Sequence, residues 1–374
     1  MTASSRFLAR AICAATSLLA LACAREAPHE APSEVEWFEI ASPLDRQVFQ
    51  RDAEGRARIG VFGTVPDESG DLRIAVSLAT RTPNASLTIT SVATRDLPGP
   101  RKRFDAQISV PEGGWHSLEL HSGGGVVKRV ARFGVGEVFL IAGQSNSTNY
   151  GEEQLPSLDD QVSAFDGVVW SLAADPMPGV QDDSQGGSPW PLFGHLVRKS
   201  VLVPVGIASA GYQGTSLAEW QPGTQRPHTA GPIELYAALR QRIGSMGCVR
   251  AILWHQGESD AEHGSSQEQY VAWFERLSTT LAHDTGCDAP WLVAHTTYLP
   301  RNQIPRRIAI RAAQAEIWEC GLALPGPETD DMLGTLRHSA DFKHFSRAGL
   351  EEHARRWFDA VSTQVLAREI ATAK

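Results

Sequence analysis

The chain has 374 residues, of which 42% are hydrophobic and 21% charged, a composition typical of globular proteins rather than of disordered chains. Its formal net charge of −9 argues against nucleic-acid binding, because contacts with phosphates need a basic surface. The length exceeds what one hydrophobic core usually serves and therefore predicts two domains.

Residues 1–22 have the pattern of a secretory signal peptide. Arg6 and Arg10 precede an apolar stretch, residues 11–22, that is too short to span a bilayer. We therefore expect an exported protein. Because this leader holds two arginines and no acidic residue, its removal would change the net charge from −9 to −11.

Cys23 directly follows this leader, in the sequence Leu-Ala-Leu-Ala-Cys. The sequence resembles a bacterial lipobox, in which the cysteine is lipidated and becomes the new N-terminus. The alternative is an ordinary cleavage after Ala22, which would give a soluble periplasmic or secreted protein. Ala24 is not the aspartate associated with inner-membrane retention, which favours the outer membrane. Residues 23–33, with two prolines, would form a tether, and the lipid anchor would be the protein's only membrane contact.

Residues 34–133 are predicted to form a small all-β sandwich that acts as an accessory domain. Short apolar runs alternate there with turn sequences such as Pro98-Gly99-Pro100, and no helical periodicity is present. Its role stays open between carbohydrate binding and simple packing or spacing. The expected strands cover residues 35–40, 57–64, 72–78, 86–92, 103–110 and 115–121.

Residues 134–374 alternate between apolar strands and helical patterns, which indicates an α/β domain with a mostly parallel sheet. Ser265 and Glu268 have the spacing of a capping box, and Ser346 is a candidate N-cap for the last helix. The expected strands cover residues 138–142, 201–208, 249–254, 291–294 and 321–324, and the other expected helices cover residues 232–243 and 308–318.

Cys248, Cys287 and Cys320 each come just before or at the start of one of these strands. If the strands are parallel, all three cysteines lie at the amino edge of the sheet. One disulfide is expected in an exported protein, either Cys248–Cys287 or Cys287–Cys320. No histidine accompanies the cysteines at ligand spacing, so we expect neither a metal site nor another cofactor.

Three polar groups of the α/β region supply a nucleophile, a base and an acid. Ser145 comes two residues after Gly143, which ends the first strand and allows a sharp turn. Asp341 and His344 are close enough in sequence for one turn to join the carboxylate to the imidazole, so that the imidazole can take the serine proton. Glu258, which follows the strand at residues 249–254, is the alternative to Asp341 as the acidic partner of His344.

Four ordered motifs carry a resemblance to a known family. The chain resembles the sialate O-acetylesterase and acetylxylan esterase branch of the SGNH hydrolases from about residue 135 to its end. This resemblance implies a flavodoxin-like three-layer α/β sandwich and a serine esterase mechanism. The motifs are Gly143-Gln144-Ser145-Asn146, a Gly214-Thr215-Ser216 segment that ends in Trp220, the stretch from His255 to Asp260, and Asp341-x-x-His344.

The resemblance also implies an oxyanion hole, which needs hydrogen-bond donors aimed at the developing negative charge. The expected donors are the backbone N–H groups of Ser145 and Gly214 and the side-chain amide of Gln256. Two departures bear on this expectation. Gln213 stands where a glycine is usual, and Ser147 stands where methionine is common.

Other residues near these motifs are expected to support the site. Glu258 and Asp260 could hold their loop through hydrogen bonds to the backbone or to Asn146. The long connection of residues 150–191 is expected to form a pocket wall. One or two of four aromatic residues near the sheet edge are expected to touch substrate, the candidates being Trp190, Tyr212, Trp220 and Trp254.

The leading hypothesis is therefore an exported serine esterase that removes O-acetyl groups from a carbohydrate through an acyl-serine intermediate. Sialic acid, xylan and related glycans all fit this prediction. The alternative from another class is a non-catalytic carbohydrate-binding surface lipoprotein with a relic hydrolase domain. A lipase or peptidase would fit the triad but not the other motifs.

Overall fold

The structure, a computed structural model, describes residues 38–78, 86–89, 92–228, 231–299 and 304–367. The predicted signal peptide at residues 1–22, the tether at residues 23–33 and the lipidation site Cys23 lie outside these residues.

The first part of the described chain is an all-β region with two sheets, as the sequence predicted. One sheet has the strand order β1-β3-β7-β6, and in the other β4 pairs with β5 and β8. Along β7 (Arg101–Pro111) buried and exposed residues alternate, which is the pattern of a strand with one face toward a core. Apolar residues of both sheets share that core. The other strands are β1 (Glu39–Ser42), β2 (Val48–Gln50), β3 (Arg56–Pro66), β4 (Leu72–Ser77), β5 (Ser86–Ile89), β6 (Ala93–Asp96) and β8 (His116–Ser122).

The long strand β9 (Gly125–Gly143) joins this region to the parallel sheet. Its first part pairs antiparallel with β8, and its last part pairs parallel with β12 (Val205–Ser209) and β13 (Ala251–His255). The predicted domain boundary between residues 133 and 134 therefore falls inside one continuous strand.

The parallel sheet has the order β10-β12-β9-β13-β14-β15, with β11 (Trp170–Leu172) antiparallel at its edge. If β10 (Val162–Phe165) is left out and the other five strands are numbered along the chain, their order across the sheet is 2-1-3-4-5. This is the flavodoxin-like order. All residues of β12 and β13 are buried, as expected for strands covered on both faces. The remaining strands are β14 (Trp291–His295) and β15 (Leu324–Glu328).

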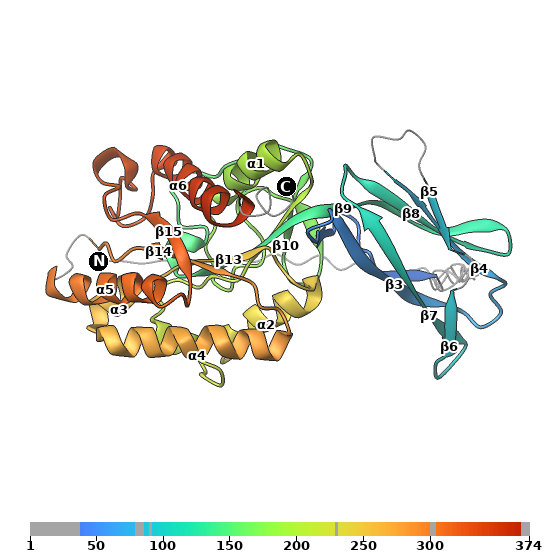
Figure 1. Cartoon of the computed structure of the whole chain (residues 1–374), viewed down its shortest axis with the longest axis horizontal. Helices are drawn as coiled ribbons and strands as arrows, with labels where there is room; N and C mark the ends of the chain where they lie inside the picture. The colour runs from blue at the N-terminus through green and yellow to red at the C-terminus, as the bar shows by residue number, and fades with distance from the viewer. Residues whose placement is uncertain (1–37, 79–85, 90–91, 229–230, 300–303, 368–374) are drawn as a thin grey trace, which may run out of the picture. The chain divides into compact units, whose positions relative to one another are not determined.

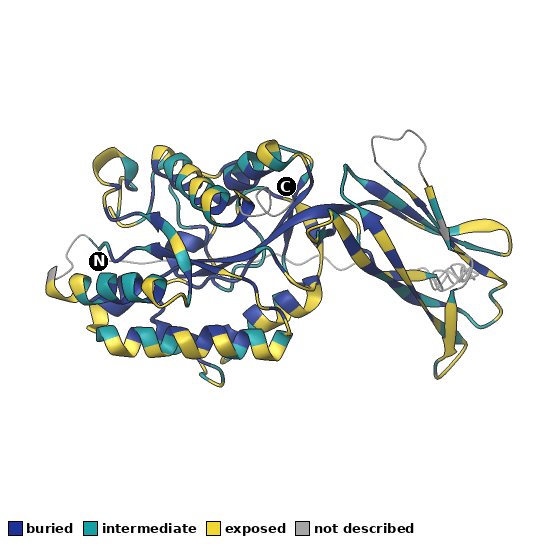
Figure 2. Cartoon of the chain, in the orientation of Figure 1, coloured by how far each residue is buried: buried dark blue, intermediate teal, exposed yellow. Residues whose placement is uncertain are grey.

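Helices cover both faces of this sheet, which confirms the predicted three-layer α/β fold (Figure 1). Side chains of α1 (Trp190–Val201) and α6 (Arg347–Val361) pack with Phe139 and Ile141 of β9 in one core. The helices on the other face contribute to a second core with Val138 and Leu140. These helices are α2 (Leu235–Met246), α4 (Gln267–Thr285) and α5 (Ile304–Glu319). Their residues are buried on the side toward the sheet and exposed on the outer side (Figure 2).

Some local predictions need correction. The capping box of α4 uses Ser266 and Gln269, one residue after the predicted pair Ser265 and Glu268. The connection of residues 150–191, for which no strand was predicted, contains the short strands β10 and β11. By contrast, the hydroxyl of Ser346 accepts a hydrogen bond from the N–H of Gly349, which confirms it as the N-cap of α6.

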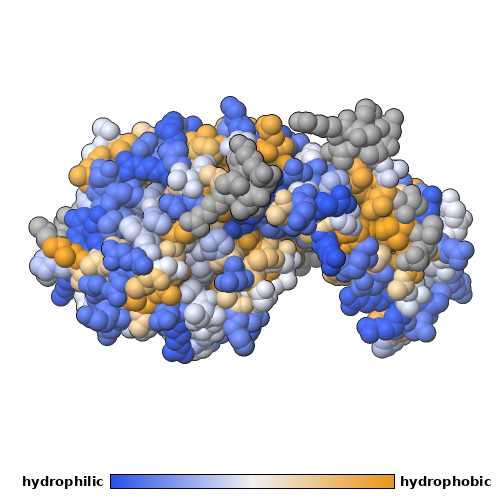
Figure 3. Space-filling model, viewed as in Figure 1, coloured by the Kyte–Doolittle hydropathy of each residue, from blue (hydrophilic) through white to orange (hydrophobic). Residues whose placement is uncertain are grey.

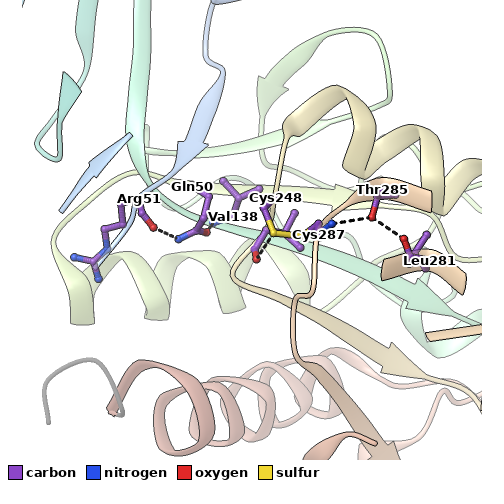
Figure 4. Close-up of a disulfide and its surroundings, with 8 residues drawn as sticks. Gln50, Arg51, Val138, Cys248, Leu281, Thr285 and Cys287 are labelled. Carbon is purple, nitrogen blue, oxygen red and sulfur yellow. Dashed lines mark hydrogen bonds between the residues drawn. A yellow bond between two sulfur atoms is a disulfide. The ribbon is translucent and has the colours of Figure 1, made fainter. Parts of the chain in front are cut away.

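Cys248 and Cys287 form a disulfide between the segments that precede β13 and β14 (Figure 4), while Cys320 is free and exposed. The structure thus selects one of the two expected pairings, at the predicted amino edge of the sheet. On the face seen in Figure 3, hydrophobic and hydrophilic residues are interspersed. No helix in the described ranges is long and apolar enough to cross a bilayer.

Candidate active site

The nucleophile candidate Ser145 lies on a tight turn at the carboxyl end of β9. Gly143 has a φ of +126°, and a Cβ atom there would lie 2.1 Å from the carbonyl oxygen of His255, so only glycine fits. The N–H of Gln144 donates to the same oxygen at 2.9 Å, which fastens the turn to the end of β13. Ser145 then begins a short 3₁₀ helix, Ser145–Ser147, and its own N–H has no partner within that helix.

Asp341 and His344 form the predicted acid and base pair. Nδ1 of His344 lies 2.6 Å from Oδ2 of Asp341. The other carboxylate oxygen accepts the backbone N–H groups of Lys343 and His344, so the turn itself orients the acid. Burial lowers the pKa of His344, and the hydrogen bond that its Nδ1–H donates to Asp341 opposes this shift only in part. The imidazole is therefore neutral at neutral pH and can act as a base.

Backbone and ring contacts bring the two turns together. The N–H of Glu152 donates to the carbonyl of Phe345 at 2.9 Å, which joins the segment after Ser145 to the segment of His344. The ring of Tyr150 stacks on the imidazole of His344 with 4.8 Å between centroids. No hydrogen bond links the Ser145 hydroxyl to His344 within the described part of the chain. Such bonds are often long before substrate binds.

The Gly214 segment follows β12 and offers a free backbone donor. Gly214 is exposed, its φ is +59°, and its N–H bonds to no other residue that the structure describes. Oδ2 of Asp182 accepts the N–H of Gln213 at 2.7 Å and holds the segment in place. The sequence analysis did not single out Asp182, because an acid in a long connection carries no local signal.

The expectation that Gln256 donates to the oxyanion must be corrected. Its side-chain nitrogen lies 2.8 Å from the carbonyl oxygen of Thr215 and 2.5 Å from Oδ2 of Asp260. These two acceptors use both amide hydrogens and also set the orientation of the amide. Gln256 is fully buried and holds the β13 loop against the Gly214 segment.

Glu258 and Asp260 support the loops, as one of the predicted alternatives stated. Oε1 of Glu258 accepts the amide of Asn146 at 3.1 Å and lies 3.4 Å from Nε2 of His255. Asp260 accepts the N–H of Leu217 at 2.8 Å, next to the Gly214 segment. His344 is therefore paired with Asp341 and not with Glu258.

A sequence model of the family described as carbohydrate esterase, sialic acid-specific acetylesterase, matches residues 135–362. The match starts within β9, includes every motif of the site and ends after α6. The chain belongs to this family. It is thus an esterase of the class that the four motifs predicted, and the predicted resemblance is confirmed.

One similar solved structure has the same fold as this acetylesterase-family chain. A carbohydrate acetylesterase from Xanthomonas citri is 18% identical, with a TM-score of 0.57, and the likeness covers 87% of this chain and 74% of that one. A protein from Arabidopsis thaliana is 19% identical, with a TM-score of 0.48, and the likeness covers 61% of this chain and 98% of the Arabidopsis chain. No curated protein matches the chain.

The aromatic residues proposed for substrate contact mostly belong to the core of this family member. Trp190, Trp220 and Trp254 are fully buried, and Tyr212 is only 9% exposed. The half-buried Tyr150 on His344 is a better candidate, which the sequence analysis missed. Among the described residues, no group of three histidine, cysteine or acidic side chains could hold a metal ion.

Proposed function

We propose that the chain removes O-acetyl groups from a carbohydrate through an acyl intermediate on Ser145. The observation that carries the proposal is the 2.6 Å contact of Asp341 with His344 on a turn that backbone bonds hold beside the Ser145 segment. The family described as sialic acid-specific makes an O-acetylated sialic acid the first substrate to test. Xylan and related glycans remain candidates.

In the first half-reaction Nε2 of His344 takes the proton of Ser145 Oγ while Oγ forms a bond to the acetyl carbonyl carbon. Asp341 keeps Nδ1 protonated and stabilises the imidazolium. The N–H groups of Ser145 and Gly214 donate to the oxyanion. When the tetrahedral intermediate collapses, the bond between the acetyl carbon and the sugar oxygen breaks, and His344 returns its proton to that oxygen.

In the second half-reaction water replaces the sugar hydroxyl. His344 takes a proton from water while the water oxygen attacks the acetyl carbon, and the bond from that carbon to Ser145 Oγ then breaks. Oγ regains the proton, and acetate leaves. The same three side chains thus serve both steps.

The test is acetate release from 9-O-acetyl sialic acid and acetylated xylo-oligosaccharides by the wild type, by Ser145→Ala and by a control, Ser117→Ala on β8. We expect release by the wild type and the control and none by Ser145→Ala. Release that survives in Ser145→Ala would disprove the acyl-serine mechanism. A folded wild type that releases no acetate from any sugar would disprove the substrate class.

The N-terminal residues support a separate proposal about location. Export by the leader and lipidation of Cys23 would anchor the esterase to a membrane surface, with a soluble exported form as the alternative. Incorporation of labelled palmitate into the wild type, and its loss in Cys23→Ala, would distinguish the two.

A further inference from the structure

A buried array of polar side chains leads from the nucleophile turn to helix α6. Glu258, which is 2% exposed, binds Asn146 on one side and contacts His255 on the other. Nδ1 of His255 lies 3.2 Å from Nε2 of His353, and the indole Nε1 of Trp357 lies 2.9 Å from the same nitrogen. His255, His353 and Trp357 are completely buried.

The donors and acceptors of this array determine where its protons lie. The indole nitrogen of Trp357 can only donate, so Nε2 of His353 must accept, and the ring hydrogen of His353 lies on Nδ1. Nδ1 of His255 faces the same nitrogen of His353.

Nε2 of His255 lies 3.4 Å from Oε1 of Glu258, and it forms no hydrogen bond with any described residue. His353 itself stays uncharged, because burial holds its pKa well below the usual value and His255 lowers it further.

The array has a cost that an apolar core would avoid. Nδ1 of His353, which carries the hydrogen, has no partner among the described residues. An unsatisfied buried donor destabilises the folded state. Packing around the ring of His353, by Phe345 and Trp190, keeps it in place, and Nε1 of Trp190 also donates to the carbonyl of Ser147 in the nucleophile turn.

Glu258 keeps a negative charge at the site. Burial would raise its pKa, but the interaction with His255 and the hydrogen bond from Asn146 lower it. Its Oε2 atom is buried and has no partner among the described residues, so the charge is only partly compensated by contacts. The other groups that sense this charge are Arg337, Tyr270 of α4 and His344.

We propose that His255, His353 and Trp357 hold Glu258 as a positioning residue, which orients Asn146 beside Ser145 and adds a second negative charge near the imidazolium of His344. Helix α6 thereby takes part in shaping the active site, although none of its residues belongs to the motifs. The inference rests on the proposed function, since it concerns catalysis by Ser145.

The first test is Glu258→Gln, with Glu262→Gln as the matched control, because Glu262 is exposed on the same helix, α3 (Glu258–His263). We expect kcat for acetyl ester hydrolysis to fall about 10- to 100-fold, less than the roughly 10²- to 10³-fold loss from removing an oxyanion donor, while KM stays nearly constant. Since the charge of Glu258 raises the pKa of His344, its removal should move the acid limb of kcat/KM to lower pH. A purely structural role would lower the melting temperature and leave that limb in place, which would overturn the proposal.

The second test does not depend on activity. Nitrogen-15 NMR of the histidine side chains should show His353 protonated on Nδ1 and, after Trp357→Phe, partly on Nε2. His353 protonated on Nε2 in the wild type would overturn the array. A wild type inactive on every acetyl ester would instead disprove the proposed function, and the NMR result would still decide the array.

Discussion

Nδ1 of His344 lies 2.6 Å from Oδ2 of Asp341, and the second oxygen of the same carboxylate accepts the N–H of His344 itself. One short turn therefore sets both the distance and the angle between acid and base. The carboxylate of Asp341 is the hydrogen-bond partner that orients the imidazole, which makes its role directly testable.

Asp341→Asn should lower kcat about 10³- to 10⁴-fold, because an amide can present its N–H to Nδ1 and favour the wrong imidazole tautomer. The measurement is steady-state hydrolysis of p-nitrophenyl acetate. Asp359→Asn, at an exposed position of α6, serves as the control and should be active. Activity of Asp341→Asn within a few-fold of wild type would show that another group orients His344.

The pH dependence of kcat/KM should have an acid limb with its midpoint below 6.5. Burial lowers the pKa of His344 from 6.5, and only its neutral form can take the serine proton, so activity is present above this pKa and lost as the pH falls through it. The electrostatic effect of His338 lowers the same pKa, so His338→Gln should move the midpoint slightly upward. A wild-type midpoint above 6.5 would contradict the observed burial.

Glu137→Gln should destabilise the fold by about 3–5 kcal/mol, because it removes a buried carboxylate that pairs with two partly buried guanidinium groups. Glu137 is completely buried and lies 2.6 Å from Nε of Arg51 and 2.5 Å from Nε of Arg250. Urea unfolding would measure the change. Glu112, the half-exposed second partner of Arg51, gives the control, since Glu112→Gln should cost less than about 1 kcal/mol. Equal effects of both substitutions would contradict the prediction.

Replacing both Cys248 and Cys287 by serine should lower the free energy of unfolding by about 4 kcal/mol, since the bridge closes a loop with a sequence separation of 39. Denaturant unfolding under oxidising conditions would show the loss. Cys320→Ser should leave stability unchanged, because this thiol is free and exposed. A loss of stability in Cys320→Ser as large as that in the double substitution would point to the other pairing, Cys287–Cys320.

Several features of the protein were predictable because they are encoded over a few adjacent residues. The apolar run before Gly143 predicted a buried strand and a turn at Ser145. The spacing of Asp341 and His344 predicted their contact, because two intervening residues can close one turn. Ser346 predicted a helix start for the same reason, since a cap bonds to N–H groups within its own first turn.

The roles of other residues depended on packing between distant segments. Gln256 could have pointed toward the oxyanion, but Thr215 and Asp260 take both its amide hydrogens. Cys248 pairs with Cys287 before the adjacent strands β13 and β14, and Cys320 is left free and exposed, a choice that sequence order alone leaves open. Strands β10 and β11 were missed because their short runs become recognisable only through the pairing of β10 with β12 and of β11 with β10.

The sequence by itself determined the fold class and the family and proposed the triad residues, because local periodicity and short motifs carry that information. Only the tertiary structure decided which acid serves His344, why Gln256 is not free to donate, and that His353 of α6 reaches the catalytic loops through His255. The physical reason is that a buried polar group must find its hydrogen-bond partners in three dimensions, and those partners are supplied by segments that the sequence keeps far apart.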